Sequence, residues 1–100
     1  MGLIKKKKTE NLSQMESKDI VDFITDVYLV DRSGLKKDDR GLYTTLDDVN
    51  EALGLYAEKI GKFYNPAKTP ASTFRLIDTV LREKAEHSEL IENKRRFYIS

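Results

Sequence analysis

Hydrophobic residues recur at helical spacing in three stretches of the chain, 17–31, 45–64 and 69–85. A three- and four-residue repeat of this kind predicts amphipathic helices with one buried face. In the first stretch we expect Ser17 to be the N-cap, because its hydroxyl can accept a bond from a free amide. In the third stretch Thr69 is the expected N-cap and Pro70 the first helical residue, a pairing that suits a helix start.

The second stretch is punctuated more heavily and predicts two helices. Thr45 is the expected N-cap of the first, and Asp47 and Asp48 follow in its first turn, where the helix dipole favours acidic residues. Gly54 can adopt the left-handed conformation that ends a helix. A second, shorter apolar stripe then covers 56–64, which gives the stretch the outline of a helix-turn-helix.

Short strand patterns complete the order of elements. "LYTT" after Gly41 predicts one brief strand, and Leu90–Ile91 and Phe97–Ile99 predict a hairpin with "ENKR" as its turn. Residues 1–14 show no apolar periodicity and are expected to form a flexible basic tail. Residues 15–100 are then a single domain of the α+β class, mostly helical, which we expect to be a winged helix-turn-helix with a C-terminal β-hairpin.

Charge is unevenly distributed along the chain, although the net charge is only +1. Residues 1–18 carry five lysines against two glutamates, and residues 19–58 carry ten acidic against four basic side chains. Residues 59–100 carry nine basic against five acidic side chains. A polyanion could therefore contact the C-terminal part while the acidic part faces away. The Lys5–Lys8 run is compatible with a solubilising tail or with an arm that touches DNA.

The segment "TLDDVNEALGLYAEKIGKFYN" resembles the helix-turn-helix of lactose-repressor-type and phage-repressor-type proteins. Two residues depart from that motif: Asn50, where a small alanine is usual, and Tyr56, where a capping Ser or Thr is usual. Gly61 also weakens the second helix, by about 1 kcal/mol relative to alanine. The apolar and glycine positions that carry the likeness are Val49, Leu53, Gly54, Leu55, Ile60 and Phe63.

The segment from Thr69 to Ser100 resembles the recognition helix and wing of multiple-antibiotic-resistance-type winged-helix regulators. The segment has the order of features found in that family: a Ser/Thr-rich start, an apolar-Arg-apolar helix, a strand, a basic wing and an aromatic strand. Two departures are "AEHSEL", where the family has a glycine turn, and the long "YAEKIGKFYNPAK" connection. The likeness is carried by Ser72, Thr73, Arg75, Leu76, Ile77, Leu81, Leu90, Ile91, Glu92, Arg96 and Tyr98.

Of the two possible recognition helices, the one at 69–85 is favoured. It offers polar and basic side chains near its start, as reading of base edges in the major groove requires. The segment 56–64 offers only Lys59 and Lys62, and Glu58 would oppose phosphate. The expected DNA-contacting residues are Ser72, Thr73 and Arg75 on the helix, Lys94, Arg95 and Arg96 at the hairpin tip, and Lys59 and Lys62 as the alternative. The hairpin cluster could instead only protect an edge strand from aggregation.

The sequence predicts no enzyme, no metal site and no cofactor. Cysteine is absent, His87 is the only histidine, and neighbouring acidic pairs such as Asp47–Asp48 do not face each other on a helix. No glycine-rich phosphate loop or nucleophile elbow occurs. No apolar run is long enough to span a membrane, so we expect a cytoplasmic protein without a membrane partner.

The expected function is sequence-specific or semi-specific binding of double-stranded DNA, as a small regulator of transcription or of a plasmid or phage element. A homodimer is expected, with Phe23, Val27 and Tyr28 of the first helix at its interface, because one such domain covers only a short half-site. The alternative is a winged-helix docking module, in which the acidic residues 19–58 bind another protein.

Overall fold

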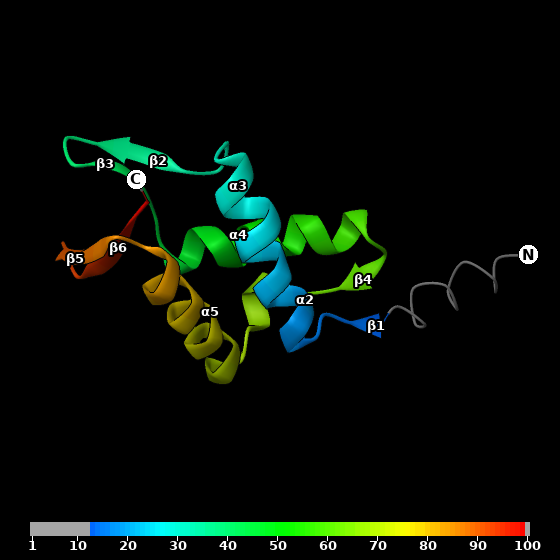
Figure 1. Ribbon diagram of the computed structural model, residues 1–100. Coiled ribbons are helices and arrows are strands. Elements are labelled where there is room, and N and C mark those ends of the chain that lie inside the picture. Colours follow the sequence, from blue (N-terminus) through cyan, green and yellow to red (C-terminus); the bar gives the residue numbers. More distant parts are fainter. Residues whose placement is uncertain (1–12, 100) are drawn as a thin grey trace, which may run out of the picture.

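The structure, a computed structural model, describes residues 13–99 and is an α+β domain with three main helical stretches and a small antiparallel sheet (Figure 1). The helical elements are α2 (Ser17–Asp22), η1 (Phe23–Tyr28), α3 (Leu29–Asp31), α4 (Leu46–Lys59), η2 (Pro66–Lys68) and α5 (Ala71–Lys84). The strands are β1 (Ser13–Gln14), β2 (Lys36–Asp38), β3 (Gly41–Thr44), β4 (Lys62–Phe63), β5 (His87–Ile91) and β6 (Lys94–Ile99). Within this range no helix has the length and apolar character that a bilayer crossing demands.

The first helical stretch is continuous from Ser17 to Asp31, as its periodicity predicts, but its cap is one residue earlier than expected. Glu16 is the N-cap, and Glu16 and Asp19 form a reciprocal capping box. The middle of the stretch, η1, is π-helical. Arg32, at φ 65°, adopts the left-handed conformation that ends it.

The predicted break at Gly54 is wrong, because α4 is one uninterrupted helix of 14 residues. Thr45 does cap it, accepting a bond from the Asp48 amide. Gly54 has a different role: a Cβ there would lie 2.6 Å from Cγ of Pro66. The glycine therefore lets the loop before α5 pack against α4, and residues 56–64 do not form the expected second helix.

The start of α5 also differs from the prediction. Pro70 is the N-cap, with extended backbone, and helical structure begins at Ala71. The Thr69 hydroxyl makes no cap; it donates to Oδ1 of Asn50 at 2.8 Å. Two prolines and a short 3-10 turn thus separate α4 from α5 without a second α-helical segment.

The main sheet has the order β2-β3-β6-β5, with every neighbouring pair antiparallel. Strand β3 and the C-terminal hairpin agree with the prediction. Strand β2 was missed, because its "KKD" sequence is polar on both faces. The hairpin turn is shorter than expected and consists of Glu92 and Asn93, both with positive φ.

A second, two-stranded sheet pairs β1 with β4 in parallel. Ser13 and Gln14, which the sequence analysis assigned to the flexible tail, therefore belong to a strand, while residues 1–12 of the expected tail lie outside the described residues. Figure 1 places this small sheet at the opposite end of the molecule from the main sheet.

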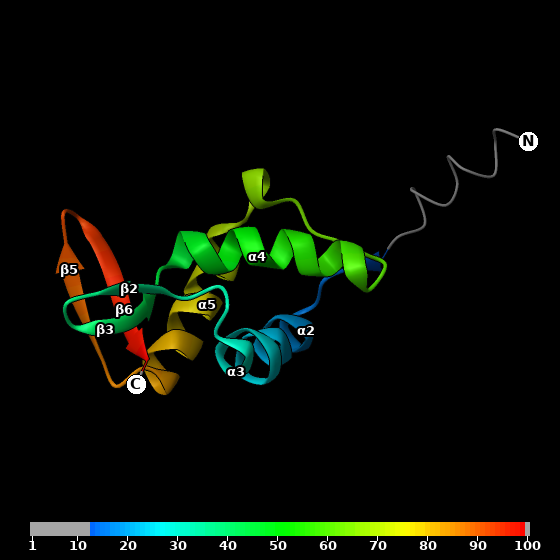
Figure 2. The ribbon, with the colours of Figure 1, turned by 90° about the horizontal axis from the view of Figure 1, so that it is seen from above.

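The core lies where the three helical stretches meet one face of the main sheet; Figure 2 shows α4 and α5 leading to that sheet. Strand β6 is central and its last three residues, Phe97, Tyr98 and Ile99, are all buried. The largest fully buried side chains are Phe97, Ile24, Leu53, Ile77, Leu81, Val49 and Thr44.

Candidate nucleic-acid interface

The N-terminal half of α5 presents a polar surface to solvent. Ser72 and Arg75 are exposed and Thr73 is partly buried. Within residues 13–99 the Arg75 guanidinium makes no ion pair, whereas Arg82, two turns later, binds Asp78 at 2.7 Å. The first amides of a helix have no intrahelical acceptor, so this end can also receive an anion.

Lys68 was missed as a candidate and lies beside this surface. It ends the 3-10 turn η2, is exposed, and lines a shallow hollow together with Pro70 and Thr73. The sequence signal was its place two residues before a helix-starting proline. We call Lys68, Ser72, Thr73 and Arg75 the α5 surface: Lys68 and Thr73 line the same hollow, and Ser72 and Arg75 are exposed one turn apart on α5.

Asn50 determines how the α5 surface is held. Its side-chain nitrogen donates to the Pro66 carbonyl at 3.0 Å, and its oxygen accepts bonds from the Tyr64 and Thr69 hydroxyls. Asn50 is only 4% exposed. Asn50, which departs from the helix-turn-helix motif, thus bonds residues 64–69 to α4. This connection leads directly into α5.

The hairpin β5–β6 differs from the prediction in where its basic residues lie. Because the turn is only Glu92–Asn93, Arg95 and Arg96 belong to strand β6 rather than to the tip. Lys94 is next to the turn and forms an exposed pair with Asp47 at 3.3 Å. Arg95 donates to Oγ of Ser88 at 2.9 Å.

Arg96 is held in a network on the outer face of the sheet. Its guanidinium lies 2.6 Å from Oδ2 of Asp38, and its central carbon is 4.4 Å from the centre of the Tyr43 ring. The Tyr98 hydroxyl donates to the same Asp38 oxygen at 2.6 Å, and the Arg40 amide donates to Oδ1. The Tyr98 hydrogen bond, with those from Arg40 and Arg96, holds the pKa of Asp38 below its ordinary value. Arg96 is thereby engaged within the sheet.

We expect Asp38→Asn to make the protein less stable at neutral pH and to flatten its loss of stability in acid. A carboxyl group with a lowered folded-state pKa stabilises the fold above its unfolded pKa, and this contribution disappears as pH falls through the folded value. The difference between wild type and Asp38→Asn should therefore shrink below about pH 4. Urea unfolding over a pH series measures it. The exposed neighbour Asp39 supplies the control, because its side chain has no hydrogen-bond or ion-pair partner among residues 13–99 and Asp39→Asn should leave stability at neutral pH nearly unchanged. Parallel curves for wild type and Asp38→Asn would contradict the prediction.

Lys59 and Lys62, the alternative candidates in the segment 56–64, lie apart from the α5 surface. Lys62 lies in β4 and pairs with Asp19 at 2.7 Å, with both side chains more than two-thirds buried. The hydrogen bond from Lys62 lowers the pKa of Asp19. Lys59 is exposed at the end of α4, where it lines a groove on a different face.

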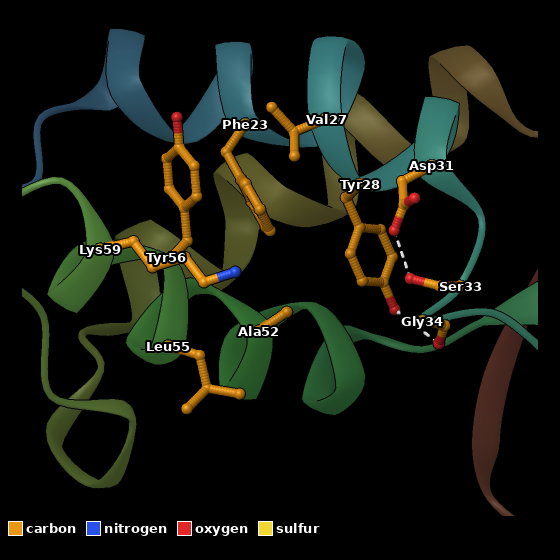
Figure 3. A pocket seen from close by; sticks show the side chains of 10 residues that line it. All are labelled: Phe23, Val27, Tyr28, Asp31, Ser33, Gly34, Ala52, Leu55, Tyr56 and Lys59. Atoms are coloured by element: carbon orange, nitrogen blue, oxygen red, sulfur yellow. Dashed lines mark hydrogen bonds between the residues drawn. The ribbon is translucent and has the colours of Figure 1, made fainter.

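That groove lies between η1–α3 and α4, with a volume of about 260 Å³ (Figure 3). Phe23 and Tyr56 line it with their rings, which are 4.5 Å apart between centres. Phe23 and Tyr28 are 5% and 7% exposed, so the expectation that they form a dimer interface is wrong. Their burial follows from packing onto α4, and only Val27 of the expected trio is exposed.

The structure therefore places Ser72, Thr73 and Arg75 in the first two turns of α5, with Lys68 just before the helix. It places Lys94 directly after the hairpin turn and pairs Arg95, Arg96 and Lys62 with other side chains. Comparison of the chain with models of protein families, with curated proteins and with solved structures finds no match.

Proposed function

We propose that the protein binds double-stranded DNA as a winged-helix domain, with α5 as the recognition helix. The order of elements supports this: a helical stretch, strand β3, helices α4 and α5, then the hairpin β5–β6. The pairing of β3 with β6, and of β6 with β5, lets the hairpin flank α5 in the manner of a wing. The role would be that of a small regulator of transcription or of a plasmid or phage element.

The observation that carries the proposal is the α5 surface itself. Arg75 is exposed on the N-terminal half of α5 without an acidic partner among residues 13–99. An arginine at this place can form paired hydrogen bonds with a guanine edge, and Ser72 can contact a base or a phosphate. Lys68 and the free amides at the helix start would hold the backbone phosphate beside them.

The wing would contribute through Lys94 and, more weakly, Arg95. The Lys94–Asp47 pair is well exposed, 70% and 66% for the two side chains, and such pairs contribute little stability. Lys94 can therefore exchange Asp47 for a phosphate at small cost. Arg96 can do so less readily, because it would leave the mostly buried Asp38 carboxylate without its positive partner and would give up its contact with the Tyr43 ring.

A homodimer remains part of the proposal, since two half-sites would raise affinity and specificity. Its interface must differ from the one expected from sequence, because Phe23 and Tyr28 belong to the core. Val27 and Val30 are the exposed apolar residues that this helix offers. Light scattering with and without duplex DNA tests the assembly.

We expect Arg75→Ala to weaken binding to the preferred duplex by about 1–3 kcal/mol, which is roughly 5- to 150-fold in Kd. The loss should be largest at one base position, because a base contact is removed. The preferred duplex is first selected from a random pool, and fluorescence anisotropy at fixed salt then gives Kd for each variant.

Arg82→Ala is the matched control, because Arg82 is on the same helix and already pairs with Asp78. It should change Kd far less than Arg75→Ala. For Lys94→Ala the slope of log affinity against log salt should shrink by about 0.9 if one phosphate contact is lost. A chain that gives no salt-dependent binding to any duplex would reject the proposal.

The second candidate function is protein docking through the acidic part of the chain. The groove between η1–α3 and α4 favours it, because exposed Val27 and Leu55 adjoin it. Absent DNA binding, together with a measurable protein complex sensitive to Leu55→Ser, would support this alternative instead.

A further inference from the structure

The groove between η1–α3 and α4 has an apolar floor and an incompletely covered rim. Figure 3 shows the rings of Phe23 and Tyr56 beside each other, with Ala52 on α4 below them. On the rim, Leu55 is 67% exposed and Val27 is 38% exposed. Exposed aliphatic side chains next to a cavity that aromatic rings line can receive one or two further apolar residues.

The charges around this groove are mainly acidic. Asp31 lines the groove itself, while Glu51 and Glu58 flank its rim residue Leu55 on α4 and line the neighbouring hollow that Leu55 also borders. None of these three carboxylates forms an ion pair with a side chain in residues 13–99, whereas Lys59 is the one basic residue lining the groove in that range. A ligand that fits both properties carries a short apolar anchor next to several positive charges.

We propose that residues 3–8 of the same chain, "LIKKKK", bind in this groove. Leu3 and Ile4 supply the apolar anchor, and Lys5–Lys8 supply four positive charges immediately after it. The segment lies outside the described residues, and its composition matches the groove in both respects. The lysine run thereby binds the acidic side of the domain and not the α5 surface.

The place where the chain enters the domain makes this contact possible. Ser13 pairs with Lys62, three residues beyond Lys59, which lines the groove. The ten residues from Leu3 to Leu12 can span up to about 33 Å, longer than the roughly 21 Å of the 14-residue helix α4. Tethering gives a short segment an effective concentration on the order of millimolar, so weak contacts suffice.

A single spin label tests the proposal in the full chain. The sequence has no cysteine, so Gly2→Cys carries a nitroxide at one defined place. Paramagnetic broadening is then read from the backbone amides of the uniformly ¹⁵N-labelled protein. We expect a strong loss of intensity at Val27 and Leu55 and little loss at Ser88 in β5, and the loss should diminish as salt is added.

Two sets of variants separate the apolar and the charged contributions. Glu51→Gln with Glu58→Gln should restore much of the lost intensity, and Leu3→Ser with Ile4→Ser should do the same. Glu83→Gln with Glu86→Gln is the matched control, because these exposed carboxylates lie at the far end of α5 and its exit, and it should leave the broadening unchanged.

The location of the broadening decides the outcome. Equal effects at Val27, Leu55 and Ser88, or no effect at any of them, would overturn the proposal. Mixing ¹⁵N protein without a label with labelled ¹⁴N protein gives a further arm. Broadening at Val27 and Leu55 in that mixture, at a strength equal to the single-chain sample, would mean that a second copy supplies the segment, and the assignment to the same chain would be wrong.

Discussion

Replacing Phe97 by alanine is expected to lower the free energy of unfolding by about 3–5 kcal/mol. Phe97 is fully buried on the central strand β6, opposite Thr44 of β3 and Ser88 of β5. Removing its ring leaves a cavity between the sheet and the helices, because the surrounding core side chains are held by their own strands and helices and cannot all move in to fill it. Urea unfolding, followed by circular dichroism, measures the change.

Leu90→Ala is the control for this prediction. Leu90 is in the same hairpin but is 62% exposed, so its truncation should change stability by no more than about 0.5 kcal/mol. Phe97→Leu should lie between the two. A loss below about 1 kcal/mol for Phe97→Ala would mean that the sheet does not pack on the helices as described.

Replacing Asn50 by leucine is expected to cost about 2–3 kcal/mol, although leucine has a similar size and is apolar. The Pro66 carbonyl loses its amide donor, and the Tyr64 hydroxyl loses its acceptor in a place with little access to water. The Thr69 hydroxyl keeps a bond to the Pro66 carbonyl at 3.1 Å, which limits the penalty. Urea unfolding again measures stability.

The effect of Asn50→Leu should be local as well as global. Hydrogen exchange should become faster in the connection 60–70 and in the first turn of α5, because Asn50 ties that connection to α4. Glu51→Ala, on the adjacent exposed position, should change neither measurement. If exchange accelerates only in the sheet, Asn50 does not hold the start of α5.

Local signals along the chain were enough to predict most helices and the hairpin. Thr45 is a cap that acts within its own helix, accepting from Asp48 three residues on. The short apolar runs Leu90–Ile91 and Phe97–Ile99, with the polar segment "ENKR" between them, predict a hairpin. These features involve residues that are close in sequence, so the amino-acid sequence is enough to predict them.

The features that were predicted wrongly or missed depend on contacts with residues that are distant in sequence. Gly54 has the local signature of a helix end, yet α4 continues, because the glycine is needed where Pro66 packs against it. Strand β2 has no apolar face of its own and exists through its pairing with β3. Hydrophobic periodicity describes neighbouring residues only, so it cannot predict contacts between segments that are distant in sequence.

The candidate site divides in the same way. The polar, basic start of α5 was predictable, since Ser72, Thr73 and Arg75 follow from helical spacing after a proline. The sequence could not predict which basic side chains are left without an ion-pair partner, because this depends on the carboxylates that folding brings close to each of them. Asp38 forms an ion pair with Arg96, which is 58 residues away along the chain, and Asp19 forms one with Lys62, which is 43 residues away. The sequence by itself determined the elements and the supply of charge; the tertiary structure decided which of those charges remain free to meet a ligand, because ion pairing depends on distance in space.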